Sequence, residues 1–213
     1  MRTSDESAQG SDAQQLLGAL VVDLDANFAD FVHCYQGVVF AVALRVSGNH
    51  TEAEDLAAES FLRAYRALRN LSDERITSLR PRSWLLTILL NVWRNALREA
   101  SRRPSQIAVA DPPDRPSAGA SVEDRVTQAE TLEELGEMVA TLPPNQRAAV
   151  VLRHVADLPM AEVASIMAVP EGTAKSHTSR GLQKLRALMG DYGLQGTVGL
   201  PARRPALSRR EPR

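Results

Sequence analysis

The clearest regularity along the chain is the return of apolar residues at steps of three and four. The first run with this spacing contains Phe28, Phe31, Tyr35, Val38, Val39, Val42 and Val46. Steps of this size place side chains on one face of an α-helix. Gly48 and Asn49 follow the run directly and are expected to end the helix. The pattern therefore predicts an amphipathic helix from about residue 28 to residue 47.

Two more helices are predicted in the same half of the chain. Thr51 stands three residues before Glu54, which is the spacing of a capping box, and starts the second. Its apolar side contains Leu56, Phe61, Ala64, Tyr65 and Leu68. Residues 70–82 have no clear period and are expected to form a loop. Pro81 then introduces a third helix from Trp84 to about Leu97, with an apolar side of Leu85, Ile88, Leu89, Val92 and Ala96.

The periodic pattern stops after Arg103 and resumes near Val122. The stretch between them is rich in Pro, Ala, Ser and Asp, a composition typical of linkers. Pro143 and Pro144 interrupt the second block, and further helices are expected over 146–155, 160–168 and from 170 onward. We therefore predict an all-α protein with two small helical domains, residues 27–103 and 122–189, joined by a flexible linker, 104–121. Residues 1–26 and the basic residues 190–213 are expected to be disordered tails.

Charge and cysteine content exclude several classes of protein. The 213 residues contain 25 Lys and Arg against 26 Asp and Glu, so any affinity for nucleic acid must come from a local patch. The single cysteine, Cys34, rules out a disulfide within the chain and is expected to be a buried small hydrophobe. There is no signal-peptide pattern, and the longest apolar run is too short to span a bilayer. We therefore expect a cytoplasmic protein without membrane insertion.

The chain carries no pattern expected of an enzyme. Its four histidines are scattered and lack the paired spacing of a metal site. No glycine-rich phosphate loop is present. We therefore expect no catalytic residues, no metal ligands and no cofactor.

Residues Met160–Leu188 have the form of a helix-turn-helix. A short helix is followed by a turn at Ala168 and Val169, and then by a longer helix whose inner side contains Ala174, Thr178, Gly181, Leu185 and Leu188. No acid lies between Glu171 and Asp191, although a merely solvated helix usually carries both signs of charge. Outward donors suit phosphates and base edges in a major groove. A plain amphipathic helix with a solvated charged face is the alternative.

Three stretches resemble the extracytoplasmic-function (ECF) group of sigma-70-type bacterial sigma factors. Region 4 of that group is similar to LPPNQRAAVVLRHVADLPMAEVASIMAVPEGTAKSHTSRGLQKLR, region 2.2 to HTEAEDLAAESFLRAYRAL, and regions 2.3 and 2.4 to RSWLLTILLNVWRNALREASRR. The resemblance covers residues 28–103 and 122–189. It implies an alternative sigma factor that binds core RNA polymerase, recognises the −35 and −10 promoter elements, helps to melt the −10 region and directs transcription at a specific regulon. A helix-turn-helix regulator that never joins the polymerase is the second hypothesis.

The resemblance also implies which residues make each contact. The −35 contacts fall on Lys175, Ser176, His177, Ser179, Arg180 and Lys184. The −10 contacts fall on the loop from Asn70 to Arg80 and on Asn91, Arg94, Asn95, Arg98, Arg102 and Arg103. The contacts with the polymerase β′ clamp helices fall on Glu54, Asp55, Glu59, Phe61 and Arg63. Further implied partners are the β flap and an anti-sigma factor.

Some of these positions suit two roles or depart from the family pattern. Phe61 suits core packing as well as an interface, Trp93 suits the core or base stacking, and Trp84 is expected in the core. Ala168 stands where the family often has Gly; a positive φ there would add about 1 kcal/mol of strain to an alanine. His177 and Thr87 stand where the family often has Arg, so the promoter sequence is expected to differ.

Overall fold

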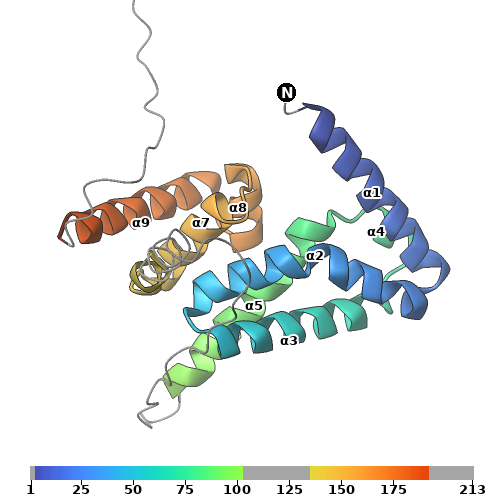
Figure 1. The fold of residues 1–213 in the computed structure, drawn as a ribbon, viewed down its shortest axis with the longest axis horizontal. Coiled ribbons are helices and arrows are strands. Elements are labelled where there is room, and N and C mark those ends of the chain that lie inside the picture. Colours follow the sequence, from blue (N-terminus) through green and yellow to red (C-terminus); the bar gives the residue numbers. More distant parts are fainter. Residues whose placement is uncertain (1–2, 103–134, 192–213) are drawn as a thin grey trace, which may run out of the picture.

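The computed structural model describes residues 3–102 and 135–191, which form helices joined by short turns (Figure 1). Within these two ranges no strand occurs, so the predicted all-α class is confirmed. The first range contains α1 (Thr3–Val22), α2 (Leu24–Ser47), α3 (His50–Leu68), α4 (Asp73–Thr77) and α5 (Pro81–Arg102). The second contains a helical segment at 135–140, then α7 (Pro144–His154), α8 (Met160–Met167) and α9 (Glu171–Asp191).

Helices α2, α3 and α5 form the core of the first half. Phe31 and Val39 of α2, and Leu85, Leu89 and Trp93 of α5, are at most 1% exposed. α2 is long and apolar enough, by composition, to cross a membrane. In the structure its apolar side packs against its neighbours, which is the ordinary situation of a core helix.

The ends of α2 and α3 show how short polar residues set helix boundaries. Gly48 ends α2 in the left-handed conformation, with φ 79°, and its N–H donates to the carbonyl of Leu44 at 2.9 Å, as the sequence predicts. Asn49 then caps α3, because its Oδ1 accepts from the N–H of Glu52 at 2.9 Å. The predicted capping box on Thr51 is wrong, since Asn49 already supplies the side-chain acceptor two residues earlier.

The N-terminal segment differs from the predicted disordered tail. Residues 3–22 form α1, which packs against α2 and α4. Leu17 and Leu20 are each 1% exposed, so burial of these side chains holds the helix in place. α4 likewise lies inside the stretch predicted as a loop and is held by the buried Ile76.

Cys34 is exposed on α2, so the prediction that it is buried is wrong. The buried stripe of α2 passes through Phe31, Tyr35 and Val39. Cys34 precedes Tyr35 by one residue and therefore points away from that stripe.

The second half is a helix-turn-helix built on α7. Ala168 forms the turn with φ 55° and ψ 46°, so the left-handed conformation considered for this alanine is present. α9 approaches α7 closely at Gly181, where an added Cβ would lie 2.6 Å from Cγ2 of Val150. Small residues at this crossing let the two helices touch.

The two halves pack against each other through α5 with α8 and through α2 with α7. In Figure 1, α7 lies between α2 and α9, so α9 is the helix farthest from the first half. The predicted linker and the predicted C-terminal tail beyond Asp191 lie outside the described residues.

Candidate nucleic-acid and polymerase interfaces

The outer face of α9 gathers the residues predicted to contact the −35 element. Exposed side chains there are Lys175, Ser176, Ser179, Arg180 and Lys184. Ala174 and Thr178 are buried on the opposite side, and the Thr178 hydroxyl donates to the carbonyl of Ala174 at 2.9 Å. The packing side and the polar side of α9 are therefore separate, and the polar side is exposed.

Two members of this face have special surroundings. Nζ of Lys175 lies 2.6 Å from Oε1 of Glu171, an exposed i,i+4 ion pair in the first turn of α9. His177 is half-buried, and its Nδ1 has no hydrogen-bond partner among the described residues. Because Nδ1 is itself buried, Nε2 is the ring nitrogen left for contact with a phosphate or a base edge.

The candidate −10 residues follow the C-terminal half of α5. Asn91, Arg98 and Arg102 are exposed, whereas Arg94 and Asn95 are half-buried. Nη1 of Arg98 donates to Oδ1 of Asn95 at 2.8 Å, which orients both side chains. Arg103 lies outside the described residues.

Arg94 contacts the other half of the molecule. Its Nη2 donates to the carbonyl of Met167, the last residue of α8, at 3.3 Å. Burial, together with the neighbouring Arg98, lowers the pKa of the Arg94 guanidinium. Arg94, one of the predicted −10 residues, therefore makes a hydrogen bond within the chain.

The tryptophans of α5 divide between two environments. Trp93 is 1% exposed and belongs to the core, so it is not available for base stacking. Trp84 is only partly buried and lines a cavity between α5 and α8.

The loop before α5 borders an open cavity of about 330 Å³. Arg69, Leu71 and Asp73 line it from the loop side, and Leu20 and Asp25 line it from α1 and α2. The hydroxyl of Tyr65 donates to the Asp25 carboxylate, and this hydrogen bond raises the pKa of Tyr65.

The acidic side of α3 carries the candidate polymerase contacts. Glu54, Asp55 and Arg63 are exposed, and Nε of Arg63 lies 2.6 Å from Oε1 of the half-buried Glu59. Phe61 is 8% exposed and packs into the core.

The exposed apolar side chain of α3 is Leu62, at 43% exposure, which the sequence reasoning missed. Its spacing from Asp55 and Glu59, seven and three residues, would have placed it on their face.

Family models and relatives agree with this geometry. The model "Sigma-70 region 2" matches residues 31–103 and "Sigma-70, region 4" matches residues 132–185. The chain is 31% identical over 184 residues to the ECF RNA polymerase sigma factor SigW of Bacillus subtilis (strain 168), covering 79% of this chain and 91% of that relative.

Two solved structures share the fold. The sigma factor RpoE of Bartonella quintana, solved in complex with the anti-sigma factor NepR, aligns with a TM-score of 0.62 at 22% identity and covers 77% of this chain and 97% of that chain. CnrH, solved in complex with the cytosolic domain of CnrY, aligns with a TM-score of 0.59 at 18% identity. The alignment covers 84% of this chain and 97% of CnrH.

The two region models fall on the two halves in the order that the resemblance predicts. A helix-turn-helix regulator that never joins the polymerase needs no region 2, so the second hypothesis is set aside. The chain belongs to the extracytoplasmic-function sigma factors, the group of sigma-70 subunits that bind core RNA polymerase and promoter DNA, and it acts as an alternative sigma factor in transcription initiation.

Proposed function

We propose that this sigma factor reads its promoters with two separate helices, α9 on the −35 duplex and α5 on the melted −10 strand. The observation that carries the proposal is that each half has one helix with a cationic or amide-rich side: Lys175, Arg180 and Lys184 on α9, and Asn95 and Arg98 on α5. The protein acts in the cytoplasm and performs no catalysis of its own.

α9 suits a major groove. Its outward residues are donors without an intervening acid, and its inner side is anchored on α7. Lysine and arginine supply phosphate contacts, which position the helix, while serine and imidazole groups reach base edges. Lys175 would exchange Glu171 for a phosphate when DNA binds.

α5 suits a single strand. The Asn95 amide and the Arg98 guanidinium form a joined donor and acceptor surface, which fits unpaired bases and their phosphates. The cavity beside the loop from Asn70 to Arg80 would receive an extruded base. Asp25 lines that cavity, and the hydrogen bond from Tyr65 would hold its carboxylate in place.

α3 suits a protein partner. Asp55, Glu59 and Leu62 lie on one side and combine acids with an exposed apolar group, as interfaces do. We assign this side to the β′ clamp helices and the helix-turn-helix half to the β flap. An anti-sigma factor is a further proposed partner, supported by the complex in which the sigma factor RpoE was solved with the anti-sigma factor NepR.

In vitro transcription tests the function directly. Purified chain is added to core polymerase with a genomic promoter library, and specific transcripts are expected. A chain that shifts duplex DNA but never supports initiation would overturn the proposal.

The polymerase face is tested by the double variant Asp55→Ala/Glu59→Ala. We expect weaker binding to isolated clamp helices, because two complementary charges are lost. Asp30→Ala, which removes an exposed acid from α2, is the control. Equal affinity of the double variant and the control would remove α3 from the interface.

A further inference from the structure

We propose that Gln146 of α7 positions His177 of α9, so that the imidazole binds one major-groove amino group of the −35 duplex without contributing a charge. This inference rests on the proposed role of α9 and adds a residue of α7 to the determinants of −35 specificity. Two buried polar atoms without partners carry it, together with the close crossing of the two helices.

The second half of the molecule contains two polar side-chain atoms that have no hydrogen-bond partner among the described residues. They are Oε1 of Gln146 and Nδ1 of His177, and both are shielded from solvent. A buried polar atom without a partner costs free energy, because its hydrogen bonds with water have been lost and not replaced. Packing alone does not account for one such atom on each of two helices that touch.

Gln146 lies where α9 approaches α7 most closely. An added Cβ on Gly181 would lie 3.5 Å from Cβ of Gln146, 3.3 Å from its carbonyl oxygen and 2.6 Å from Cγ2 of Val150. Because glycine has no side chain, the side chain of Gln146 begins directly against α9. The amide of Gln146 is therefore within reach of the neighbouring side chains of that helix.

His177 lies one turn before Gly181 on the side of α9 that faces α7. At about 100° per residue, His177 and Gly181 differ by about 40°, and Thr178 differs from Gly181 by about 60° in the opposite direction. Thr178 faces α8, because its hydroxyl lies 4.0 Å from Sδ of Met160. His177 is therefore on the side of Gly181 that is away from α8 and next to α7.

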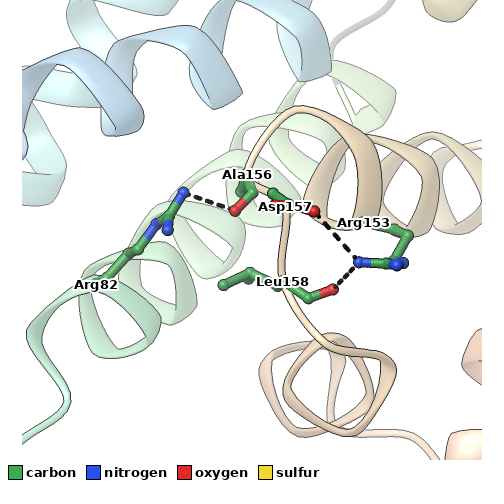
Figure 2. A network of polar contacts seen from close by, with 5 residues as sticks. All are labelled: Arg82, Arg153, Ala156, Asp157 and Leu158. Carbon is green, nitrogen blue, oxygen red and sulfur yellow. Dashed lines mark hydrogen bonds and ion pairs between the residues drawn. The ribbon is translucent and has the colours of Figure 1, made fainter. Parts of the chain in front are cut away.

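Contacts with the backbone fix the helices around this crossing. Nη1 of Arg153 donates to the carbonyl of Leu158 at 2.9 Å and lies 3.5 Å from Oδ1 of Asp157. Figure 2 shows both contacts closing the turn between α7 and α8. Since α9 packs on both of these helices, rotation about side-chain bonds is the movement that can bring Gln146 and His177 together.

The two buried atoms are chemically complementary. The amide oxygen of Gln146 accepts a hydrogen bond, and a neutral imidazole with its proton on Nδ1 donates one. A hydrogen bond between them would satisfy both atoms and hold the ring of His177 in one orientation. It would also fix the tautomer, because the other ring nitrogen, Nε2, then keeps its lone pair.

An imidazole whose Nε2 keeps a lone pair accepts a hydrogen bond and cannot donate one to a phosphate. The hydrogen-bond donors in the major groove are the N6 amino group of adenine and the N4 amino group of cytosine. His177 should therefore select adenine or cytosine at one position of the −35 element. Lys175 and Arg180 differ from it, because their charged groups donate to phosphates or to guanine.

Duplex binding by the full chain tests the pair through Gln146→Met, His177→Ala and the double variant. Gln146→Met keeps the length of the side chain and removes the amide. At pH 8, each single variant should bind a duplex selected by the wild-type chain about three- to tenfold more weakly. The double variant should bind no more weakly than His177→Ala, because Gln146 acts through the imidazole. Asn145→Ala removes an exposed amide from the same turn of α7 and should stay within about twofold of wild type.

Two further measurements separate this role from a merely structural one. In a panel of duplexes with single base-pair replacements, Gln146→Met and His177→Ala should both lose the preference for adenine or cytosine at the same position. A merely structural loss would weaken binding to every duplex alike. The slope of log affinity against log salt should be unchanged in His177→Ala, whereas it should fall by about 0.9 in a variant that loses a phosphate contact.

Three results would overturn the proposal even if the chain supports transcription. Additive losses in the double variant would show that Gln146 does not act through His177. A lower salt slope in His177→Ala would place the imidazole on a phosphate. A preference for guanine or thymine at the affected position would contradict the proposed tautomer. Failure of transcription would instead overturn the proposed function, while duplex binding by the full chain still decides the role of the pair.

Discussion

The helices α5 and α9 carry similar polar groups but present them in opposite situations. α9 buries one side, at Ala174, Thr178 and Gly181, and leaves the other open. α5 lies at the centre of its domain, with Leu85, Leu86, Leu89, Leu90, Val92 and Trp93 all buried. Its polar strip is therefore narrow, and α8 can cover part of it. A helix at the edge of the fold leaves one whole side open to a partner, whereas a core helix exposes only a narrow strip.

Among these substitutions, Gly181→Ala should produce the largest difference between DNA binding by α9 and DNA binding by α5. The new Cβ would lie 2.6 Å from Cγ2 of Val150, so α9 must move away from α7 at a cost of about 1–3 kcal/mol. Thermal unfolding should show this loss, and duplex binding should fall while single-strand binding by α5 survives.

Gly172→Ala is the matched control on the same helix. An added Cβ at Gly172 meets nothing within 4 Å, so alanine should raise stability by about 0.5–1 kcal/mol. Equal effects of the two substitutions would mean that α9 does not depend on its close approach to α7.

Arg180→Ala should weaken duplex binding by about tenfold, which corresponds to 1.4 kcal/mol. If Arg180 contacts a phosphate, the slope of log affinity against log salt should also fall by about 0.9. Arg66→Ala serves as control, because Arg66 is an exposed arginine of α3, in the other half of the molecule. An equal loss of duplex affinity in both variants would mean that binding depends on the total positive charge and not on the outer face of α9.

Ala168→Gly should stabilise the helix-turn-helix by up to about 1 kcal/mol. Ala168 has φ 55°, a conformation that strains a residue with a Cβ but not glycine. Denaturant unfolding measures the gain, and a loss of stability would show that the turn is unstrained. α5 has no corresponding turn, so single-strand binding should not change.

The smallest expected effect is that of Glu171→Gln. The ion pair with Lys175 is exposed on both sides, so it contributes about 0.2–1 kcal/mol. Its loss frees Lys175 for phosphate and should tighten duplex binding by about twofold, measured by anisotropy at low salt. Weaker binding would mean that Glu171 holds Lys175 in its binding position.

Much of the fold was predictable because its signals are local. Apolar periodicity located the helices, and Gly48, Pro81, Pro143 and Pro144 marked boundaries near the observed ones. The α8–α9 motif could be predicted because its turn and its small inner residues lie in one short stretch.

The rest depended on tertiary contacts that leave little trace in sequence. α1 is helical because Leu17 and Leu20 find partners on α2 and α4, and its polar beginning concealed this pair. The contacts of Arg82, Arg94 and Arg147 end on backbone carbonyls of the opposite half, which have no sequence signature. Site residues could be proposed one by one, but not the hydrogen bonds that join the two halves.

The central claim is that α9 binds duplex DNA and α5 binds a single strand. The most direct test measures the affinity of one variant of each helix for both forms of DNA within the holoenzyme. Asn95→Ala/Arg98→Ala and Arg180→Ala/Lys184→Ala are each assembled with core polymerase and titrated with the −35 duplex and the −10 non-template strand of one selected promoter. We expect the α5 variant to lose the single strand and keep the duplex, and the α9 variant to do the reverse. Equal losses of both probes in both variants would contradict the account.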